Sequence, residues 1–144
     1  MIQIANPDDT EEISLLNRQL RIDLPCSFPW DTPEWIAEEI TKGNYYVYRD
    51  WEGIAGALCL RTDSQNGNIE AMAIRSNTHG QGIGRKLVEF AVSRCRLLNI
   101  GTLSVHSFCL YGVRPFYEKC GFTCVGDNRT YHEVPYYSFS MSLK

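Results

Sequence analysis

The sequence has few features of a secreted, membrane or nucleic-acid-binding protein. Its 144 residues include 14 lysines and arginines against 17 aspartates and glutamates, so it lacks the basic excess of most nucleic-acid-binding domains. The longest strongly apolar run, residues 54–60, is far shorter than the roughly 20 residues that a membrane-spanning helix needs. The N-terminus, MIQIANPDDTEE, is acidic where a secretory signal is basic and then apolar. We therefore expect a cytoplasmic protein that binds neither nucleic acid nor membrane.

Signatures of metal and disulfide sites are also missing. The six cysteines include no CxxC pair, and small secreted scaffolds are denser in cysteine. The three histidines, at positions 79, 106 and 132, have no ligand spacing with a cysteine pair, which argues against a zinc site. We expect free, mostly buried thiols and no bound metal.

What remains is the composition of an ordinary globular domain. Hydrophobic residues make up 44% of the chain and charged residues 22%, which is typical of folded proteins. A chain of this length leaves little room for a second domain, and it contains no repeat, low-complexity tract or linker. The sequence predicts a single domain over residues 1–144.

Hydrophobic periodicity predicts strands in both halves of the chain, with one long helix between them. The expected strands cover residues 2–5, 44–50, 52–63, 68–74, 102–108, 122–125 and 134–142. The expected helices start at residues 7–10 and 31–34, run over 82–98 with Gly101 as the terminator, and occupy 113–119. Residues 23–30, with two prolines, predict a loop. This order favours an α+β fold with a mixed sheet wrapped by helices.

The densest chemical signal is the segment His79–Arg85, HGQGIGR, which follows a predicted strand and opens the long helix. Its three glycines permit tight turns and close approach of a ligand to the backbone. Free amides at a helix start attract anions, and Arg85 adds a cation, so a pyrophosphate is the expected ligand. The spacing matches neither a P-loop nor GxGxxG. The alternative is a glycine-rich turn that binds nothing.

Two segments resemble the GNAT superfamily of N-acetyltransferases. Residues 72–84, MAIRSNTHGQGIG, followed by RKLVEFAVSRC, look like the family's motif A, with His79 where the family has Arg or Gln. Residues 115–122, PFYEKCGF, are similar to a second family segment, and the order of elements fits along the whole chain. The resemblance implies a mixed, mostly antiparallel central sheet flanked by helices, and an enzyme that uses acetyl-CoA as co-substrate.

The resemblance also implies roles for particular residues. Backbone groups of Met72 and Ile74 would bind the pantetheine arm and polarise the thioester carbonyl, and Tyr117 would protonate the departing thiolate. The remaining cofactor-binding residues would be His79, Gly80, Gln81, Gly82, Ile83, Gly84, Arg85 and Phe116. Taken by themselves, Met72 and Ile74 are equally compatible with a core role, and Tyr117 with packing beneath a loop.

The general base has more than one candidate. Strict strand alternation would place Glu70, Met72 and Ile74 on one face, which makes Glu70 the first choice. A bulge in this strand would change that parity, and a solvated or salt-bridged carboxylate is an equal alternative for Glu70. His106, near the end of the next strand, is the second choice. His132 and Glu133 are weaker candidates.

The loop 23–30 is expected to cover an acceptor pocket. Phe28, Trp30 and Asp31, together with Tyr136 and Tyr137, are the residues expected to line it. The resemblance implies acetyl transfer to a primary amine of a small molecule or peptide by direct attack in a ternary complex. A non-catalytic acyl-CoA-binding regulatory domain of the same fold is the alternative, and a homodimer is compatible with either reading.

Overall fold

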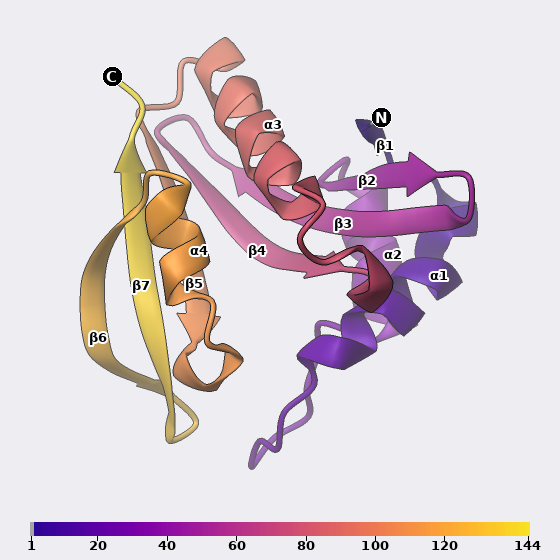
Figure 1. Ribbon diagram of the computed structural model, residues 1–144, viewed down its shortest axis with the longest axis horizontal. Helices are drawn as coiled ribbons and strands as arrows, with labels where there is room; N and C mark the ends of the chain where they lie inside the picture. Colours follow the sequence, from indigo (N-terminus) through magenta and orange to yellow (C-terminus); the bar gives the residue numbers. More distant parts are fainter. Residues whose placement is uncertain (1) are drawn as a thin grey trace.

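A seven-stranded sheet with the order β1-β2-β3-β4-β5-β7-β6 forms the centre of the computed structural model (Figure 1). The model describes residues 2–144, and the side chain at position 128 lies outside that description. The β4–β5 pair is parallel and the neighbouring pairs are antiparallel, so the predicted mixed, mostly antiparallel sheet is confirmed. The strands are β1 (Ile2–Ile4), β2 (Tyr45–Asp50), β3 (Gly53–Thr62), β4 (Asn66–Ile74), β5 (Thr102–Phe108), β6 (Thr123–Tyr131) and β7 (Val134–Ser142).

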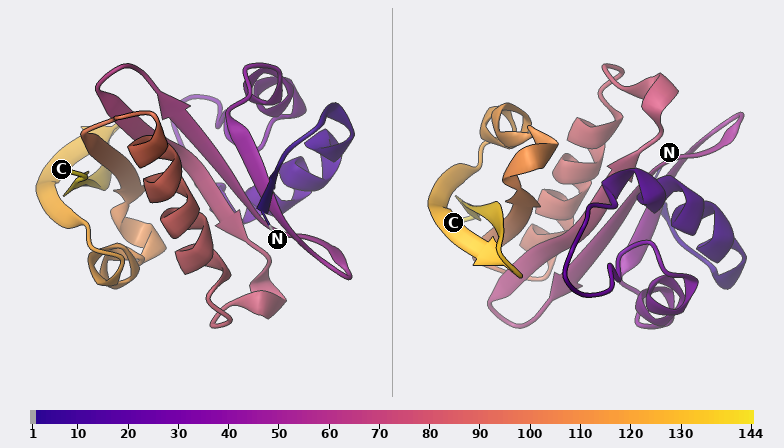
Figure 2. Two further views of the ribbon diagram at one scale, coloured as in Figure 1. Left: turned by 90° about the horizontal axis from the view of Figure 1, so that it is seen from above. Right: turned by 90° about the horizontal axis from the view of Figure 1, so that it is seen from below.

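Helices cover both faces of this sheet (Figure 2). They are α1 (Thr10–Asn17), α2 (Pro33–Thr41), α3 (Ile83–Leu97) and α4 (Arg114–Lys119). Short 3-10 turns occupy Pro7–Asp9, Arg18–Leu20, Ser76–Thr78 and Cys109–Tyr111. Over residues 2–144, none of the helices combines the length and the apolar character needed to cross a bilayer.

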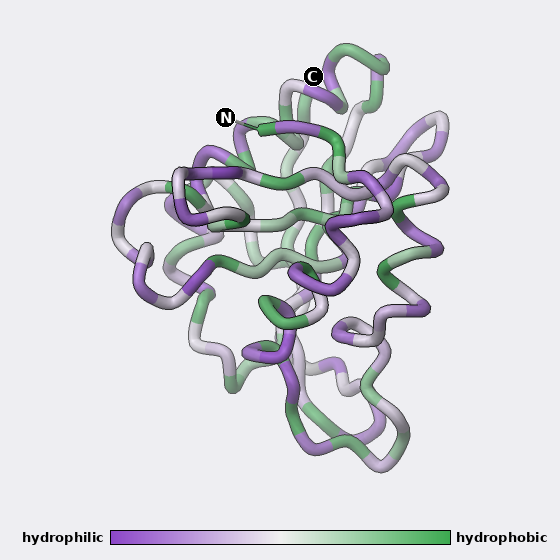
Figure 3. Tube along the Cα trace, turned by 90° about the vertical axis from the view of Figure 1, so that its right-hand side faces the viewer, coloured by the Kyte–Doolittle hydropathy of each residue, from purple (hydrophilic) through white to green (hydrophobic). Residues whose placement is uncertain are grey.

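Each face of the sheet has its own hydrophobic core. Under α3, Leu87 and Ala91 pack with strand residues such as Leu103, as the predicted apolar stripe requires. Under α1 and α2, Ile13 and Ile36 form a second buried cluster with residues of β2 and β3. Leu98, the last residue of the helix expected over 82–98, is 45% exposed, because α3 has already ended there. Figure 3 shows apolar positions concentrated along the inner strands and polar ones at the peripheral turns.

The helix ends follow local chemistry. The Thr32 hydroxyl accepts a hydrogen bond from the Trp35 N–H and caps α2, which begins at Pro33 as predicted. The prediction that Gly101 terminates the long helix is wrong. Asn99 adopts the left-handed conformation with φ 59°, and the Ile100 N–H then donates to the Cys95 carbonyl. Asn tolerates this conformation better than most residues, so it closes α3 two positions early.

The strands β4 and β5 stay together over only part of their length. Their pairing covers Asn66–Ile69 and Thr102–Val105, and beyond it the two strands diverge (Figure 1). The second half of β4 therefore has β3 on one side and no strand on the other. This divergence leaves backbone polar groups of β4 free for another partner.

Candidate active site

A cavity of about 480 Å³ lies where β4 and β5 diverge. This volume is within the usual range for small-molecule sites. Its walls come from the turn Arg18–Leu20 after α1, the loop before α2, both diverging strands, α4 and the β6–β7 hairpin. The lining residues are Gln19, Leu20, Phe28, Trp30, Asn68, Ile69, Glu70, Ala71, Met72, Ala73, Ile74, His79, Val105, His106, Ser107, Phe108, Tyr111, Val113, Tyr117, Tyr131 and Tyr136.

The backbone of β4 directs two amides into this cavity. Just past the strand, the Arg75 N–H donates to the Ala55 carbonyl of β3 at 2.7 Å. Bonded and non-bonded pairs alternate along an antiparallel ladder, so Met72 and Ile74 point their N–H and C=O groups away from β3. These are the two residues whose amides the resemblance implicates, and their orientation is the one that such a role requires.

Polar contacts bridge the mouth of the cavity. The Ile74 carbonyl accepts hydrogen bonds from Gln19 Nε2 at 2.6 Å and from His79 Nε2 at 3.0 Å. The Tyr111 hydroxyl donates to the Leu20 carbonyl, 91 positions away in the sequence. The turn Arg18–Leu20 is thus joined both to the end of β4 and to the turn after β5. His79 contributes to this closure with its side chain.

The glycine loop forms an open cradle at the start of α3. Gly80 and Gly82 have φ values of +87° and +79°, and a Cβ at either position would meet no atom within 4 Å. The first helical hydrogen bond runs from the Lys86 N–H to the Gly82 carbonyl, so the amides between them have no partner within the helix. Positive φ, open space and free amides together fit a pyrophosphate group.

The side chains around the cradle have different surroundings. A Cβ at Gly84 would lie 3.1 Å from the ring of Phe116, so this glycine allows α4 to pack against the first turn of α3. Ile83 is buried in the core and offers only its backbone. Gln81 and Arg85 are exposed, and Arg85 pairs with Glu89 at 3.3 Å. The cation of the motif therefore lies at the surface.

Tyr117 reaches the cavity from α4. Its side chain is buried, with 6% of its surface exposed, and its ring packs against Phe122 and Phe139. Burial raises the pKa of the Tyr117 phenol well above its ordinary value. The hydroxyl is therefore protonated at neutral pH, and its raised pKa makes it a weaker acid than an exposed tyrosine.

Glu70 stands at a β-bulge. In the β3–β4 register, Cys59 lies opposite Ala71 and Leu60 lies opposite Ile69, so Glu70 is the extra residue. Ile69 and Met72 pack in the core under α3, whereas Ala71 packs in the core under α1 and α2. Strict alternation of Glu70, Met72 and Ile74 on one face is therefore wrong, because the bulge reverses the parity. Glu70 nevertheless lines the cavity.

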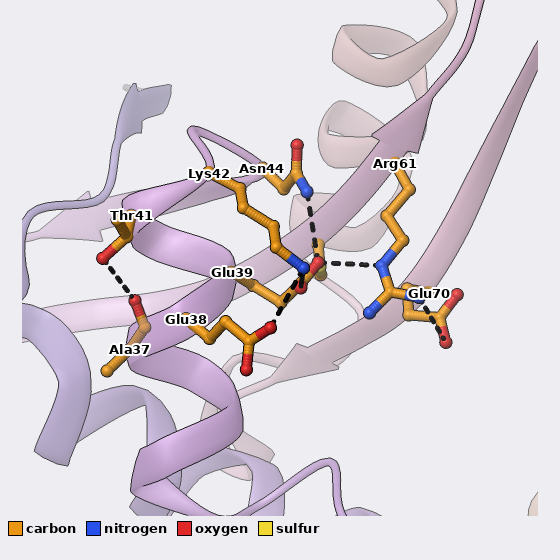
Figure 4. Close-up of polar contacts among 9 residues, drawn as sticks. Ala37, Glu38, Glu39, Thr41, Lys42, Asn44, Arg61 and Glu70 are labelled. Atoms are coloured by element: carbon orange, nitrogen blue, oxygen red, sulfur yellow. Dashed lines mark hydrogen bonds and ion pairs between the residues drawn. The ribbon is translucent and has the colours of Figure 1, made fainter.

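An ion-pair network centred on the buried carboxylate of Glu39 reaches Glu70 through Arg61 (Figure 4). Glu39 of α2 is 1% exposed and accepts hydrogen bonds from Arg61 Nε at 2.8 Å, Asn44 Nδ2 at 3.1 Å and Lys42 Nζ at 3.3 Å. Burial alone would raise the pKa of Glu39, but these donors outweigh it and hold the pKa at about 2. Arg61 also places Nη1 3.7 Å from the Glu70 carboxylate.

Asn68 completes the setting of the Glu70 side chain. Its amide nitrogen donates to Glu70 Oε2 at 2.9 Å, while Arg61 approaches Oε1. Glu70 is therefore both ion-paired and cavity-lining, and its role as general base stays a prediction.

The histidine candidates separate clearly. His106 lines the cavity, with Nδ1 2.9 Å from the Ser138 hydroxyl oxygen. Partial burial, aided by the charge of Arg129, lowers the pKa of His106, so its ring is neutral at neutral pH. His132 and Glu133 form the β6–β7 turn, with φ values of 46° and 71°, and do not line the cavity. Over residues 2–144, no three His, Cys, Asp or Glu side chains are grouped as metal ligands.

The expected aromatic wall is only partly correct. Phe28, Trp30 and Tyr136 line the cavity, as predicted. The prediction for Asp31 is wrong, because its buried carboxylate is paired with Arg21 at 2.8 Å. The prediction for Tyr137 is also wrong, because its ring lies beneath the guanidinium of Arg114.

Three further aromatic residues of this wall were missed from the sequence. Phe108, Tyr111 and Tyr131 also line the cavity, and they come from β5, the turn after it and β6. Their only signal in the sequence is aromatic enrichment near strand ends. That signal becomes specific only when the pairing of β5, β7 and β6 is known.

Comparison with known proteins agrees with this geometry. The model of the acetyltransferase (GNAT) domain matches residues 30–143. The chain belongs to this GNAT family. A 62-residue segment is 36% identical to glucosamine 6-phosphate N-acetyltransferase from Arabidopsis thaliana, covering 43% of this chain and 40% of that protein. The match thus spans less than half the length of this curated relative.

Solved structures of GNAT-like shape extend over the whole chain. The Ard1 structure from Thermoplasma volcanium has a TM-score of 0.82 at 17% identity, covering 99% of this chain and 96% of that chain. Rv2747 from Mycobacterium tuberculosis, solved with CoA, has a TM-score of 0.82 at 15% identity, covering 100% and 99%. At such low identity, these structures show only that the chain shares their fold.

Proposed function

We propose that this GNAT protein transfers the acetyl group of acetyl-CoA to a primary amine of a small molecule or peptide, by direct attack in a ternary complex. The observation that carries the proposal is one cavity that brings together a buried tyrosine, a carboxylate and two strand amides, beside an open glycine cradle. The relative from Arabidopsis thaliana is named for a sugar-phosphate amine, which supports amine acetylation as the reaction class.

The cradle and the edge of β4 are suited to hold acetyl-CoA. The pyrophosphate would be bound by backbone amides at the start of α3, within the segment His79–Arg85, with Phe116 packed alongside. The amides of Met72 and Ile74 would hold the pantetheine arm and the thioester carbonyl. When bound, acetyl-CoA supplies an activated acetyl group.

The proposed proton transfers follow from the surroundings of two side chains. Glu70 accepts the proton that the amine loses as its nitrogen bonds to the acetyl carbon. Tyr117 donates its proton to the sulfur as the carbon–sulfur bond breaks. A strand amide aimed at the carbonyl oxygen stabilises the negative charge that develops there. The neutral ring of His106 is the alternative proton acceptor.

The substitution Tyr117→Phe tests this proposal. It removes the proton donor and keeps the ring packing, so kcat should fall about 100-fold while the Kd for acetyl-CoA stays unchanged. Turnover is measured by release of free thiol and binding by calorimetry. The control is Tyr48→Phe, because Tyr48 lies outside the cavity, against Lys86.

Two results would contradict the proposal in different ways. Binding of acetyl-CoA without turnover, across a panel of amines, would indicate a non-catalytic regulatory domain. Absence of acetyl-CoA binding at millimolar concentration would overturn both the activity and the assigned cofactor site.

A further inference from the structure

An aromatic cluster lines one part of the cavity, which we call the amine end. Trp30 is at its centre, with ring centroids 5.0 Å from Phe28, 6.2 Å from Phe108 and 5.8 Å from Tyr131. Tyr136 continues the wall on β7, with its ring 5.5 Å from that of His106. These rings come from four segments of the chain, and they face a space large enough for a small organic molecule.

The charge of the lining is one-sided. Among the described residues that line the cavity there is one carboxylate, Glu70, and there is no lysine or arginine. The two histidines are engaged: His79 contacts the Ile74 carbonyl, and His106 has a lowered pKa and is neutral. A carboxylate or phosphate placed here would be buried without a positive partner, which is costly.

The nearest guanidinium groups do not supply that partner. Arg61 is paired with Glu39 and Glu70. Arg21 is paired with the buried Asp31 and lies over the Phe28 ring, outside the lining. Arg129 is exposed on β6 and is not part of the lining. Because Arg129 lies opposite Tyr136 in the β6–β7 register but outside the lining, an anionic acceptor would find no lysine or arginine within the lining itself.

The same wall suits an amine on an apolar body. Aromatic rings attract an ammonium group through their faces and cover an apolar body by contact. Glu70 provides the one negative charge and accepts the proton on reaction. We propose, on the basis of the function proposed above, that the acceptor is a primary amine on an aromatic body that bears no carboxylate or phosphate.

Two matched pairs of amines test this inference. Phenylethylamine and phenylalanine differ by a carboxylate, and glucosamine and glucosamine 6-phosphate differ by a phosphate. With acetyl-CoA and the intact protein, kcat/KM for phenylethylamine should exceed that for phenylalanine by more than about tenfold, because the carboxylate would be buried unpaired. The value of kcat/KM for phenylethylamine should also exceed the values for spermidine, glucosamine and glucosamine 6-phosphate.

Variants of the wall connect the preference to particular residues. Trp30→Leu should raise KM for phenylethylamine about tenfold and leave KM for acetyl-CoA unchanged, because it removes ring contacts at the amine end alone. The control is Trp51→Leu, since Trp51 is 91% exposed at the tip of the β2–β3 hairpin. Thermal unfolding of both variants separates loss of contact from loss of fold.

A second variant tests the charge argument without truncating the cluster. Tyr136→Arg places a cation on the wall and should raise kcat/KM for phenylalanine relative to phenylethylamine by about tenfold. An unchanged ratio would overturn the charge argument.

The outcomes distinguish this inference from the proposed function. Faster turnover of glucosamine 6-phosphate, spermidine or phenylalanine than of phenylethylamine would overturn the inference and leave the acetyltransferase function standing. No turnover with any amine, together with no acetyl-CoA binding, would overturn both.

Discussion

The two ends of the candidate site are built from opposite materials. The cradle end consists of glycines and free helix amides, it is open to solvent, and it suits an anion. The amine end has aromatic rings and a single carboxylate in its lining, and we propose that it disfavours anions. One end works through backbone and the other through side chains. The difference explains why one cofactor can be held while the acceptor specificity is set separately.

The largest expected effect comes from a substitution that disrupts the cradle end alone. Gly82→Glu puts bulk and negative charge into the open space beside the helix amides, so the affinity for acetyl-CoA should fall more than about 100-fold. Calorimetry measures the change. Gly43→Glu is the matched control, because Gly43 has a similar φ of +77° and open surroundings at the end of α2. Tight binding by the Gly82 variant would show that the phosphates lie elsewhere.

The next effect breaks the amine end alone. Glu70→Gln removes the proton acceptor and should lower kcat about 100-fold without changing the Kd for acetyl-CoA. Steady-state kinetics and calorimetry give the two quantities, and Glu11→Gln on the exposed surface of α1 is the control. An unchanged kcat would transfer the role to His106 or to water.

A third test addresses the support of the amine end. Glu39→Gln weakens the ion pair between the buried Glu39 and the partly exposed Arg61, and should lower the free energy of unfolding at pH 7 by about 2 kcal/mol. The pKa of Glu39 is about 2 in the folded protein against an ordinary 4.5, so the unfolded chain binds the extra proton on acidification. The stabilisation is therefore present above pH 4.5 and is lost as the pH falls toward 2.

Urea unfolding at several pH values checks this expectation. The difference between wild type and Glu39→Gln should be largest near neutrality and shrink as the pH falls below 4.5. A difference that is constant with pH would mean that the ionised form of Glu39 contributes nothing.

The smallest effect concerns the hydrogen bond that joins the turn after β5 to the turn Arg18–Leu20. Tyr111→Phe removes the hydrogen bond to the Leu20 carbonyl and should cost about 1 kcal/mol in the free energy of unfolding. Urea titration measures it against Tyr48→Phe. Equal stability of the two variants would show that this hydrogen bond does not stabilise the fold.

Local chemistry made most of the elements predictable. The cap at Thr32, the apolar stripe of α3 and the glycines of the cradle act over a few residues, and the structure contains each of them. One error also has a local cause: Asn99 replaced Gly101 as the terminator because both residue types tolerate left-handed backbone.

The site itself was predictable only where it is made of contiguous backbone. By itself the sequence predicted the loop 79–85 as an anion site, and its resemblance to the GNAT family added the amides of β4 and Tyr117, because each lies within a short segment of recognisable pattern. Tertiary structure alone decided the bulge at Glu70 and the aromatic wall around Trp30. Both depend on strand register and on packing between segments up to about a hundred residues apart, and the periodicity of a single strand carries no information about its partner.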